Sequence, residues 1–459
     1  MCPARKCAML YLPAGETSPT KEREGKPMSP EIERILQQTL DRIENALQTD
    51  ITPEELSRAA GFSHYHFCRI FKAATGLSVM RYITLRRLAH ALYSISCGQE
   101  KTEAALAYGF DSYAGFYKAF RRAYGASPTE HLRSHRAAFP ARVNLKERGE
   151  NMEKHIIEQA LAHWGLEGAA AQAVRYPNTG NLSGSTFSVA EGYVLKASRG
   201  LGSMQRQAVL QKVLHAHGLA AQVVPTLDGR DTACAEGWEC LLMERLPGEA
   251  LRAELLLREP AMGRMVGEGL ARLHTALKEC DPLLCSRECF ADTLRGWALP
   301  KLREAEGDRW QWAETWLEGF AALEKELPVQ IIHRDPNPDN LLAAEGRITG
   351  FLDLELSCIA PRIFDLAYAA TGVLSVAFGQ AGDGEAFAEL ARAIWSGYHA
   401  ASPLAPEERR ALPDMVIAIQ LICVAAFTGT DRFARLAATN RQMLELILAN
   451  EEKLREPIA

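Results

Sequence analysis

The 459-residue sequence lacks any uninterrupted apolar run close to the roughly 18 to 20 residues that a membrane-spanning helix requires. The nearest candidate, Met415 to Phe427, is shorter and contains Gln420, so it predicts a buried helix and no membrane partner. The first residues, Met1 to Lys6, are followed by neither the apolar core nor the cleavage site of a secretory signal. We therefore expect a cytoplasmic protein.

Paired cysteines of the C-x2-C kind are also absent. The 11 cysteines are odd in number and scattered, which favours reduced thiols over disulfides. Cys280, Cys285 and Cys289 form a cluster with the spacing C-x4-C-x3-C, and free or partly buried thiols explain it better than a metal site does.

The overall composition is that of a globular protein, with 47% hydrophobic and 24% charged residues. At roughly 100 to 200 residues per domain, this length predicts about two to four domains. The charge is unevenly divided, because residues 1–140 contain 19 Lys and Arg against 14 Asp and Glu, whereas the remainder contains 33 against 43. This asymmetry permits a polyanionic partner for the basic front half only.

The front half predicts helices after a leader. Residues 1–27 are rich in Pro, Gly, Lys and Glu without periodicity, which is typical of a flexible segment. Further on, Thr52-Pro53-Glu54-Glu55 is a capping-box pattern that begins a short helix ending near Gly61, and another helix begins at His64. Two helices joined by so short a turn indicate a helix-turn-helix unit.

This unit is repeated after 49 residues, and a long helix from about Val79 to Ser96 joins the two copies. A small helical bundle with solvated charges would explain one copy as well as a DNA-binding domain does. The presence of two tandem copies favours the DNA-binding domain. The corresponding positions are Phe67 with Phe116, Phe71 with Phe120, and Gly61-Phe62 with Gly109-Phe110.

The span from Glu55 to Pro128 resembles the AraC family of transcriptional regulators. The resemblance is carried by Leu56-Ser57-Arg58-Ala59-Ala60-Gly61-Phe62, Tyr108-Gly109-Phe110 and Phe120-Arg121-Arg122-Ala123-Tyr124-Gly125-Ala126-Ser127-Pro128. It implies an all-α DNA-binding domain over residues 28–136, in which two recognition helices enter successive major-groove segments of double-stranded DNA. The base-reading side chains that it implies are Tyr65, His66, Arg69, Tyr113, Tyr117 and Lys118, and the phosphate contacts are Lys72, Arg121 and Arg122.

One helix departs from the AraC pattern. Thr102 to Leu106 is short and weakly apolar where the family usually places a larger aliphatic residue. We therefore expect the second unit to pack less tightly than the first.

A linker over residues 137–153 separates the N-terminal helical domain from a second domain. After an amphipathic helix from Lys154 to Trp164, strand-like runs occupy Gln172 to Tyr176, Thr186 to Val189 and Gly192 to Ala197. The first two runs are joined by a Gly/Ser-rich loop whose backbone N–H groups can approach phosphates. Taken alone, the loop is better explained as an ordinary hairpin turn, and the lysine in the next strand is what gives the phosphate interpretation weight. The candidate phosphate contacts in this loop are Ser183, Gly184 and Ser185.

The third run places Lys196 among aliphatic residues, where nucleotide kinases keep the lysine that pairs with phosphate oxygens. Such kinases usually add a glutamate on the following helix, but no Asp or Glu occurs from Gly192 to Leu227. We expect Gln207 to take its place and to accept a hydrogen bond from Lys196 without the charge. An apolar strand then runs into a Pro-Gly break, which predicts a hinge whose backbone meets adenine at Met243, Glu244 and Leu246.

The chemistry is concentrated in an H-x-D pattern at His333-Arg334-Asp335, followed by Asn340 and an apolar hairpin that leads to Asp353. Asp335 can accept or orient the proton of an attacking hydroxyl. Asn340 and Asp353 offer the hard oxygen ligands that Mg²⁺ prefers, and the hairpin would bring them together.

Residues 170 to about 370 resemble the aminoglycoside phosphotransferase and choline kinase-like family. Besides these motifs, the match includes Leu273-His274 and Phe364-Asp365-Leu366-Ala367. The resemblance implies an α+β, bilobal protein kinase-like domain over residues 154–459, with a small lobe to about 246, a large helical lobe from about 247, and ATP between them. It also implies that His333 and Asp365 support the catalytic loop.

Three functions remain open. The chain is either a regulator whose kinase-like half senses ATP and a small molecule, or a working phosphotransferase that also regulates transcription, or a regulator whose kinase fold is only a structural or dimerising module. The acceptor or effector, the operator, the sign of regulation and the oligomeric state are not determined by these motifs. Because Lys196 lacks its usual acidic partner, the sequence also leaves open whether the domain still transfers a phosphoryl group.

Overall fold

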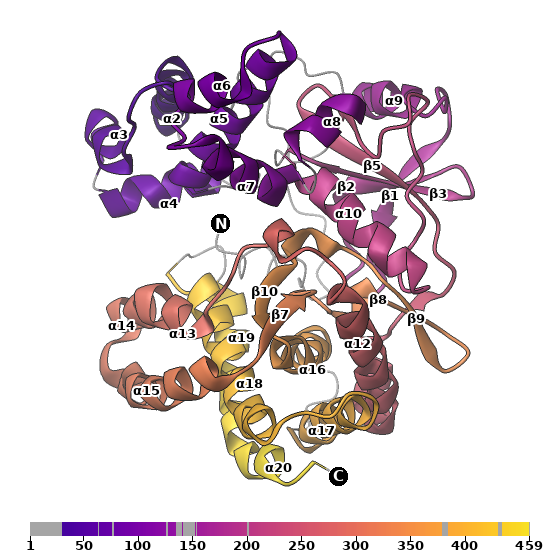
Figure 1. Ribbon diagram of the computed structural model, residues 1–459. Helices are drawn as coiled ribbons and strands as arrows, with labels where there is room; N and C mark the ends of the chain where they lie inside the picture. Colours follow the sequence, from indigo (N-terminus) through magenta and orange to yellow (C-terminus); the bar gives the residue numbers. More distant parts are fainter. Residues whose placement is uncertain are drawn as a thin grey trace.

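The computed structural model describes residues 30–62, 64–75, 78–124, 127–134, 140, 152, 154–199, 202–378, 384–429 and 434–458. The expected leader lies outside these residues, as does all of the expected linker except residues 140 and 152. A helical region is followed by an α+β region in two lobes (Figure 1).

The helical region is built from two small cores that share one helix. Phe67 and Phe71 are buried in the first core, and Phe116 and Phe120 are buried in the second, as the repeat predicts. The shared helix, α5, gives its first turns to the first core and its later turns to the second. The helices are α2 (Pro30–Asn45), α3 (Pro53–Ala59), α4 (His64–Thr75), α5 (Val79–Ser96), α6 (Lys101–Ala107), α7 (Tyr113–Tyr124) and α8 (Pro128–Ser134).

Local signals in the sequence explain where these helices begin and end. The predicted capping box is confirmed at α3, because Thr52 accepts from the N–H of Glu55 and the Glu55 carboxylate accepts from the N–H of Thr52. Gly61 and Gly109, the equivalent turn residues of the two units, both have φ of +75°, which other residues rarely adopt. The repeated Gly-Phe pair therefore marks a repeated turn. In the second unit α6 leaves Leu106 exposed.

The small lobe contains a five-stranded antiparallel sheet in the order β1-β2-β3-β5-β4. One face packs against α9 through Ile156, Ile157 and Leu161, and the other packs against α10 through Met204 and Ala208. β2 begins four residues earlier than the sequence indicated, so Ser183 to Ser185 lie within a strand. The elements are α9 (Lys154–Ala162), β1 (Ala171–Arg175), β2 (Leu182–Val189), β3 (Tyr193–Ser198), α10 (Ser203–Ala216), β4 (Ala233–Ala235) and β5 (Trp238–Glu244).

The large lobe is mainly helical around short strands. A sheet in the order β6-β8-β9 and a two-stranded sheet of β7 and β10 carry the catalytic segments. The elements are β6 (Glu249–Ala250), α11 (Ala253–Arg258), α12 (Gly263–Leu277), α13 (Phe290–Thr293), α14 (Leu299–Glu306), α15 (Gln311–Glu326), β7 (Val329–Ile332), β8 (Leu341–Ala344), β9 (Arg347–Phe351), β10 (Cys358–Pro361), α16 (Ile363–Ala377), α17 (Gly384–Ala401), α18 (Pro406–Phe427), α19 (Ala434–Ala449) and α20 (Glu451–Arg455).

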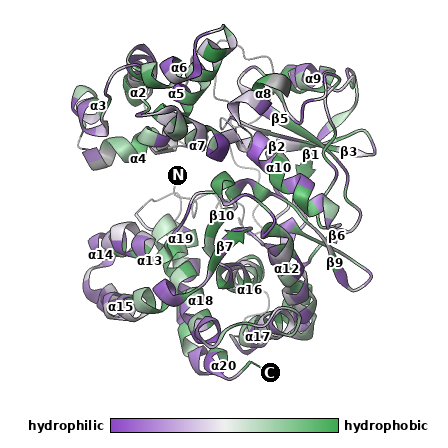
Figure 2. Cartoon of the chain, viewed as in Figure 1, coloured by the Kyte–Doolittle hydropathy of each residue, from purple (hydrophilic) through white to green (hydrophobic). Residues whose placement is uncertain are grey.

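The large lobe is centred on its most hydrophobic helices, including α16 (Figure 2). α18 is longer than the sequence indicated, and by length and composition it could cross a membrane. However, 89% of its apolar window is buried inside the protein, as is usual for a core helix. The predicted buried helix is therefore confirmed.

Candidate active site

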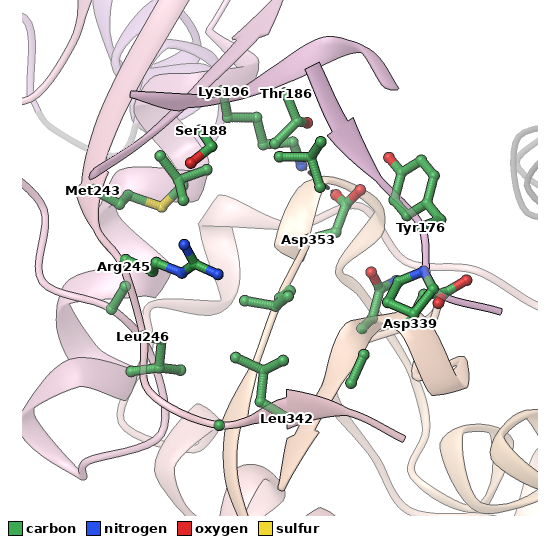
Figure 3. A pocket seen from close by; sticks show the side chains of 18 of the residues that line it. Tyr176, Thr186, Ser188, Lys196, Met243, Arg245, Leu246, Asp339, Leu342 and Asp353 are labelled. Atoms are coloured by element: carbon green, nitrogen blue, oxygen red, sulfur yellow. Dashed lines mark hydrogen bonds and ion pairs between the residues drawn. The ribbon is translucent and has the colours of Figure 1, made fainter. Parts of the chain in front are cut away.

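A cavity of about 550 Å³ lies between the two lobes. Figure 3 shows the side chains of Lys196 and Asp353 close together at one side of it and those of Met243, Arg245 and Leu246 at another. Predicted site residues that line the cavity are Lys196, Met243, Glu244, Leu246, Asn340 and Asp353. In β2 its lining is formed by Thr186 and Ser188, and the described positions of Ser183, Gly184 and Ser185 do not contribute to it.

Lys196 is held by one charged partner and one neutral partner. Its Nζ donates to Oε1 of Gln207 on α10 at 3.2 Å, which confirms the expected amide partner, and it forms an ion pair with Asp353. Burial alone would lower the pKa of Lys196, but the charges of Asp353 and Glu355 outweigh it and raise that pKa. Burial would likewise raise the pKa of Asp353, whereas Lys196 brings it below its usual value. Both groups are therefore charged near neutral pH.

Asp335 lies in the catalytic loop after β7 and is only 1% exposed. Its Oδ1 accepts from Nδ2 of Asn337 at 3.0 Å, and its backbone oxygen accepts from Nδ2 of Asn340 at 2.9 Å. Burial raises the pKa of Asp335 to about 7. A carboxyl group that titrates near neutral pH is suited to accepting a proton from a hydroxyl.

The β8–β9 hairpin brings Asn340 and Asp353 together as predicted. Leu341 pairs with Phe351, and the N–H of Leu352 donates to the carbonyl oxygen of Asn340 at 2.9 Å. Because Nδ2 of Asn340 donates to Asp335, its side-chain oxygen is the atom left for a cation. With the Asp353 carboxylate this forms an oxygen donor set of the kind that Mg²⁺ prefers, so these two residues fit the metal.

Two buried groups brace the catalytic loop from behind. Asp365, which is 0% exposed, accepts from the N–H groups of His333 and Arg334 at 2.8 and 2.9 Å and contacts Nε2 of His274 at 2.9 Å. Nε2 of His333 lies 2.8 Å from the carbonyl oxygen of Leu352, so this nitrogen carries the proton. Burial lowers the pKa of His333, which keeps the ring neutral. The ring thus joins the catalytic loop to the segment that carries Asp353.

Arg334 adopts a positive φ of +76°, which is strained for a residue with a side chain. Its guanidinium lies over the Phe364 ring at 4.3 Å, and its Nε donates to Glu288 at 2.9 Å. These contacts hold the turn that presents Asp335.

The lobes are also connected through Asn178, a residue that the sequence did not single out. Nδ2 of Asn178, in the turn after β1, donates to Asp339 at 2.7 Å and to the carbonyl oxygen of Leu251 at 2.8 Å. Oδ1 of Asn178 accepts from the N–H of Ala253 at 3.0 Å. Asp339 directly precedes Asn340 in the catalytic motif, and this position was the only hint in the sequence that Asp339 belongs to the site. Asn178, 161 residues away from Asp339, had none.

The proposed DNA contacts lie on α4 and α7. The second-unit residues Tyr113, Tyr117, Lys118, Arg121 and Arg122 occupy α7, where Lys118 and Arg122 are exposed and Nη2 of Arg121 pairs with Asp281 at 2.7 Å. The first-unit residues fall on α4, but their side chains lie outside the described part of the structure. They are Tyr65, His66, Arg69 and Lys72.

Residues 177–411, just over half of the chain, match the family model described as "Phosphotransferase enzyme family". The chain belongs to this phosphotransferase family. Residues 56–134 match a model described as "Helix-turn-helix domain", of the AraC type. Both predicted resemblances, and the predicted order of an all-α domain before a kinase-like α+β domain, are confirmed.

Curated relatives match one half of the chain or the other. The uncharacterized HTH-type transcriptional regulator YbfP of Bacillus subtilis (strain 168) is 30% identical over 30% of this chain and 43% of its own length. A homoserine kinase of Phenylobacterium zucineum (strain HLK1) is 31% identical over 44% of this chain and 62% of its own length. The chain thus spans less than two thirds of either relative.

A solved structure, the aminoglycoside phosphotransferase from Alicyclobacillus acidocaldarius, shares the fold of the second half. The match has a TM-score of 0.50 at 16% identity and covers 68% of this chain and 97% of that one.

Proposed function

We propose that the protein is a sequence-specific DNA-binding transcriptional regulator whose phosphotransferase-family domain binds ATP with Mg²⁺ and a small molecule, as effector or as substrate. One observation carries the proposal: a duplicated helix-turn-helix domain shares the chain with an interlobe cavity lined by Lys196, Asn340 and Asp353. The partners are double-stranded DNA, a nucleotide and a hydroxyl-bearing molecule. We place the protein in the cytoplasm as part of this proposal.

In this proposal each lobe supplies part of the nucleotide site. Lys196 pairs with nucleotide phosphates, and the backbone at Met243, Glu244 and Leu246 meets the adenine. Ser183, Gly184 and Ser185 approach the phosphates only if β2 shifts, since Thr186 and Ser188 face the cavity now. Asn340 and Asp353 hold Mg²⁺, which neutralises charge on the phosphates when bound.

The second candidate is an active phosphotransferase. Asp335, held by Asn337 and Asn340, would orient an acceptor hydroxyl and take its proton, because its pKa of about 7 leaves an ionised fraction at neutral pH. The homoserine kinase relative supports a small hydroxyl-bearing metabolite as acceptor. The neutral Gln207 beside Lys196 favours the first candidate, since it lacks the charge that usually fixes this lysine. A third possibility is a kinase fold that serves only as a structural or dimerising module.

The deciding experiment is turnover of Mg-ATP with a panel of aminoglycosides, amino alcohols, sugars and homoserine. Wild type is compared with Asp335→Asn, which keeps the shape of the side chain, and with Asp292→Asn as a control at an exposed carboxylate. Acceptor phosphorylation that Asp335→Asn abolishes and Asp292→Asn retains would establish the enzyme. ATP binding without such turnover would leave the sensor, and absence of both would leave the structural module.

A further inference from the structure

The C-terminal end of α7, the second recognition helix, is docked on the phosphotransferase domain. It packs against α10 of the small lobe (Figure 1). It also packs against the short 3-10 helix η3 (Pro282–Leu284) of the large lobe. Nη2 of Arg121 lies 2.7 Å from Oδ2 of Asp281, the residue that caps η3. The domains are thus joined at a helix that is expected to enter DNA.

The docking on α10 is a close approach of backbones. A Cβ built on Gly202, the residue before α10, would lie 2.7 Å from the carbonyl oxygen of Ala123. Gly202 also has φ of +71°, so both its conformation and its neighbour require glycine. The carbonyl end of α7 therefore faces the amide end of α10, an arrangement that the two helix dipoles favour.

This contact competes with DNA for the same side chain. Arg121 is one of the expected phosphate contacts, and in the docked state its guanidinium is paired with a carboxylate in place of a phosphate. The Asp281 carboxylate would repel a DNA phosphate brought to the same guanidinium. Opening of this pair therefore favours DNA binding by the second unit through Arg121.

The helix on which α7 rests also reaches the nucleotide site. Gln207 of α10 accepts from Lys196, and Nη2 of Arg206, its neighbour, donates to the carbonyl oxygen of Glu355 at 2.6 Å. The N–H of Glu355 in turn donates to Oδ1 of Asp353 at 3.3 Å. A metal that draws Asp353 to itself would loosen its ion pair with Lys196 and its contact with Glu355, the residue that Arg206 of α10 holds, even while Lys196 keeps its contact with Gln207.

The ion pair between Arg121 and Asp281 is the weak part of this interface. It is partly exposed, with 42% of the Arg121 side chain and 27% of the Asp281 side chain accessible, and such pairs contribute little. Repulsion between positive charges also opposes the docking of α7 on α10. Burial, together with the charges of Arg206 across the interface and of Arg122, lowers the pKa of Arg81 on α5 to about 10.

We propose that the phosphotransferase domain holds the second recognition helix in an autoinhibited position through Asp281 and α10, and that Mg-nucleotide at Lys196 and Asp353 releases it for DNA. This inference rests on the proposed function and adds to it a direction: nucleotide increases DNA affinity.

The test measures binding of the full chain to a fluorescent duplex recovered by selection from random DNA, at fixed salt, with and without Mg-AMP-PNP. Binding of AMP-PNP is measured separately by calorimetry. The informative variant is Asp281→Asn, which removes the charge but keeps an N-cap residue for η3. Glu279→Gln is the matched control, because Glu279 lies two residues away and pairs with His217 and not with α7.

We expect Mg-AMP-PNP to tighten DNA binding by wild type. Asp281→Asn should bind DNA roughly two- to five-fold more tightly without nucleotide, the range of a partly exposed ion pair, and should respond less to nucleotide. Glu279→Gln should behave as wild type. Hydrogen exchange of the α7 amides should rise on nucleotide binding in wild type.

Three results would overturn the inference while leaving the proposed function intact. These are nucleotide binding with unchanged DNA affinity, weaker DNA binding in its presence, and equal effects of Asp281→Asn and Glu279→Gln, which would reduce the effect to general electrostatics. A chain that binds no nucleotide in calorimetry would instead overturn the proposed function, and the inference with it.

Discussion

Replacing Gln207 by glutamate should restore the acidic partner that Lys196 lacks and should change how the site binds metal. Lys196 is 5% exposed and Gln207 is 1% exposed, so their 3.2 Å contact is shielded from water. A hydrogen bond between charged groups is worth roughly 1.5 to 3 kcal/mol, against about 0.5 to 1.5 for a neutral one. The substitution should therefore strengthen this contact by about 1 to 1.5 kcal/mol.

The stronger contact should increase nucleotide affinity only when Mg²⁺ is present. Without metal, the carboxylate introduced by Gln207→Glu would share Lys196 with Asp353, and this additional buried charge should lower the stability of the chain. With metal, Asp353 would hold Mg²⁺ and the new carboxylate would keep Lys196. We expect Gln207→Glu to bind Mg-AMP-PNP roughly five- to ten-fold more tightly than wild type, since 1.4 kcal/mol is about a factor of ten.

The assay is calorimetric titration of AMP-PNP in Mg²⁺ and in EDTA, combined with thermal unfolding in both buffers. Gln211→Glu is the matched control, because Gln211 is also buried on α10 and lines the cavity but donates to the carbonyl oxygen of Ala221. Equal nucleotide affinities for Gln207→Glu and wild type in Mg²⁺ would refute the reasoning. A gain of the same size in EDTA, or in Gln211→Glu, would refute it as well.

Three further changes test other parts of the structure. In metal-free buffer the unfolding free energy of wild type, relative to that of Asp335→Asn, should fall by about 4 kcal/mol between about pH 4 and pH 7. The reason is that the Asp335 carboxyl has a pKa of about 7 in the folded chain against 3.8 in the unfolded chain, so over this range the folded chain keeps a proton that the unfolded chain releases. Parallel pH profiles of the two proteins in chemical denaturation would contradict this. Asn178→Ala should lower stability by about 1 to 3 kcal/mol, since it removes the side-chain contacts of Asn178 and leaves buried Asp339 only the backbone N–H of residue 178, and an unchanged denaturation midpoint would show that the side-chain connection contributes nothing. Arg69→Ala should weaken binding to the selected duplex by about 1 to 3 kcal/mol and to random DNA by less, and equal losses in a gel-shift titration would remove Arg69 from base recognition.

Short-range patterns were the most informative part of the sequence. The hairpin between Asn340 and Asp353 is contiguous, so its apolar character was enough to predict that the two residues meet. Gln207 was predicted as the partner of Lys196 because it lies on the helix directly after the lysine strand, in a stretch without acidic residues. The duplicated turns at Gly61 and Gly109 were visible because glycine adopts their backbone conformation far more readily than other residues do.

Contacts between distant segments were not predictable in this way. Ser183 to Ser185 have the composition of a turn, but the pairing of Leu182 with Arg175 on β1 extends β2 through them, because tertiary pairing overrides local preference. The contacts of Asn178 with Asp339 and of Arg121 with Asp281 each join segments far apart in the chain. Neither polar pair leaves a periodic signal, so it becomes visible only in the folded molecule.

The most direct test of a nucleotide-responsive DNA-binding protein is the affinity of the full chain for Mg-AMP-PNP, measured by calorimetry with the chain free and then saturated with the selected duplex. Coupling between two binding sites is reciprocal, so DNA must change nucleotide affinity by the same factor by which nucleotide changes DNA affinity. Tighter nucleotide binding on DNA, lost in Asp281→Asn but kept in Glu279→Gln, is the predicted result. Identical nucleotide affinity with and without DNA would contradict the account.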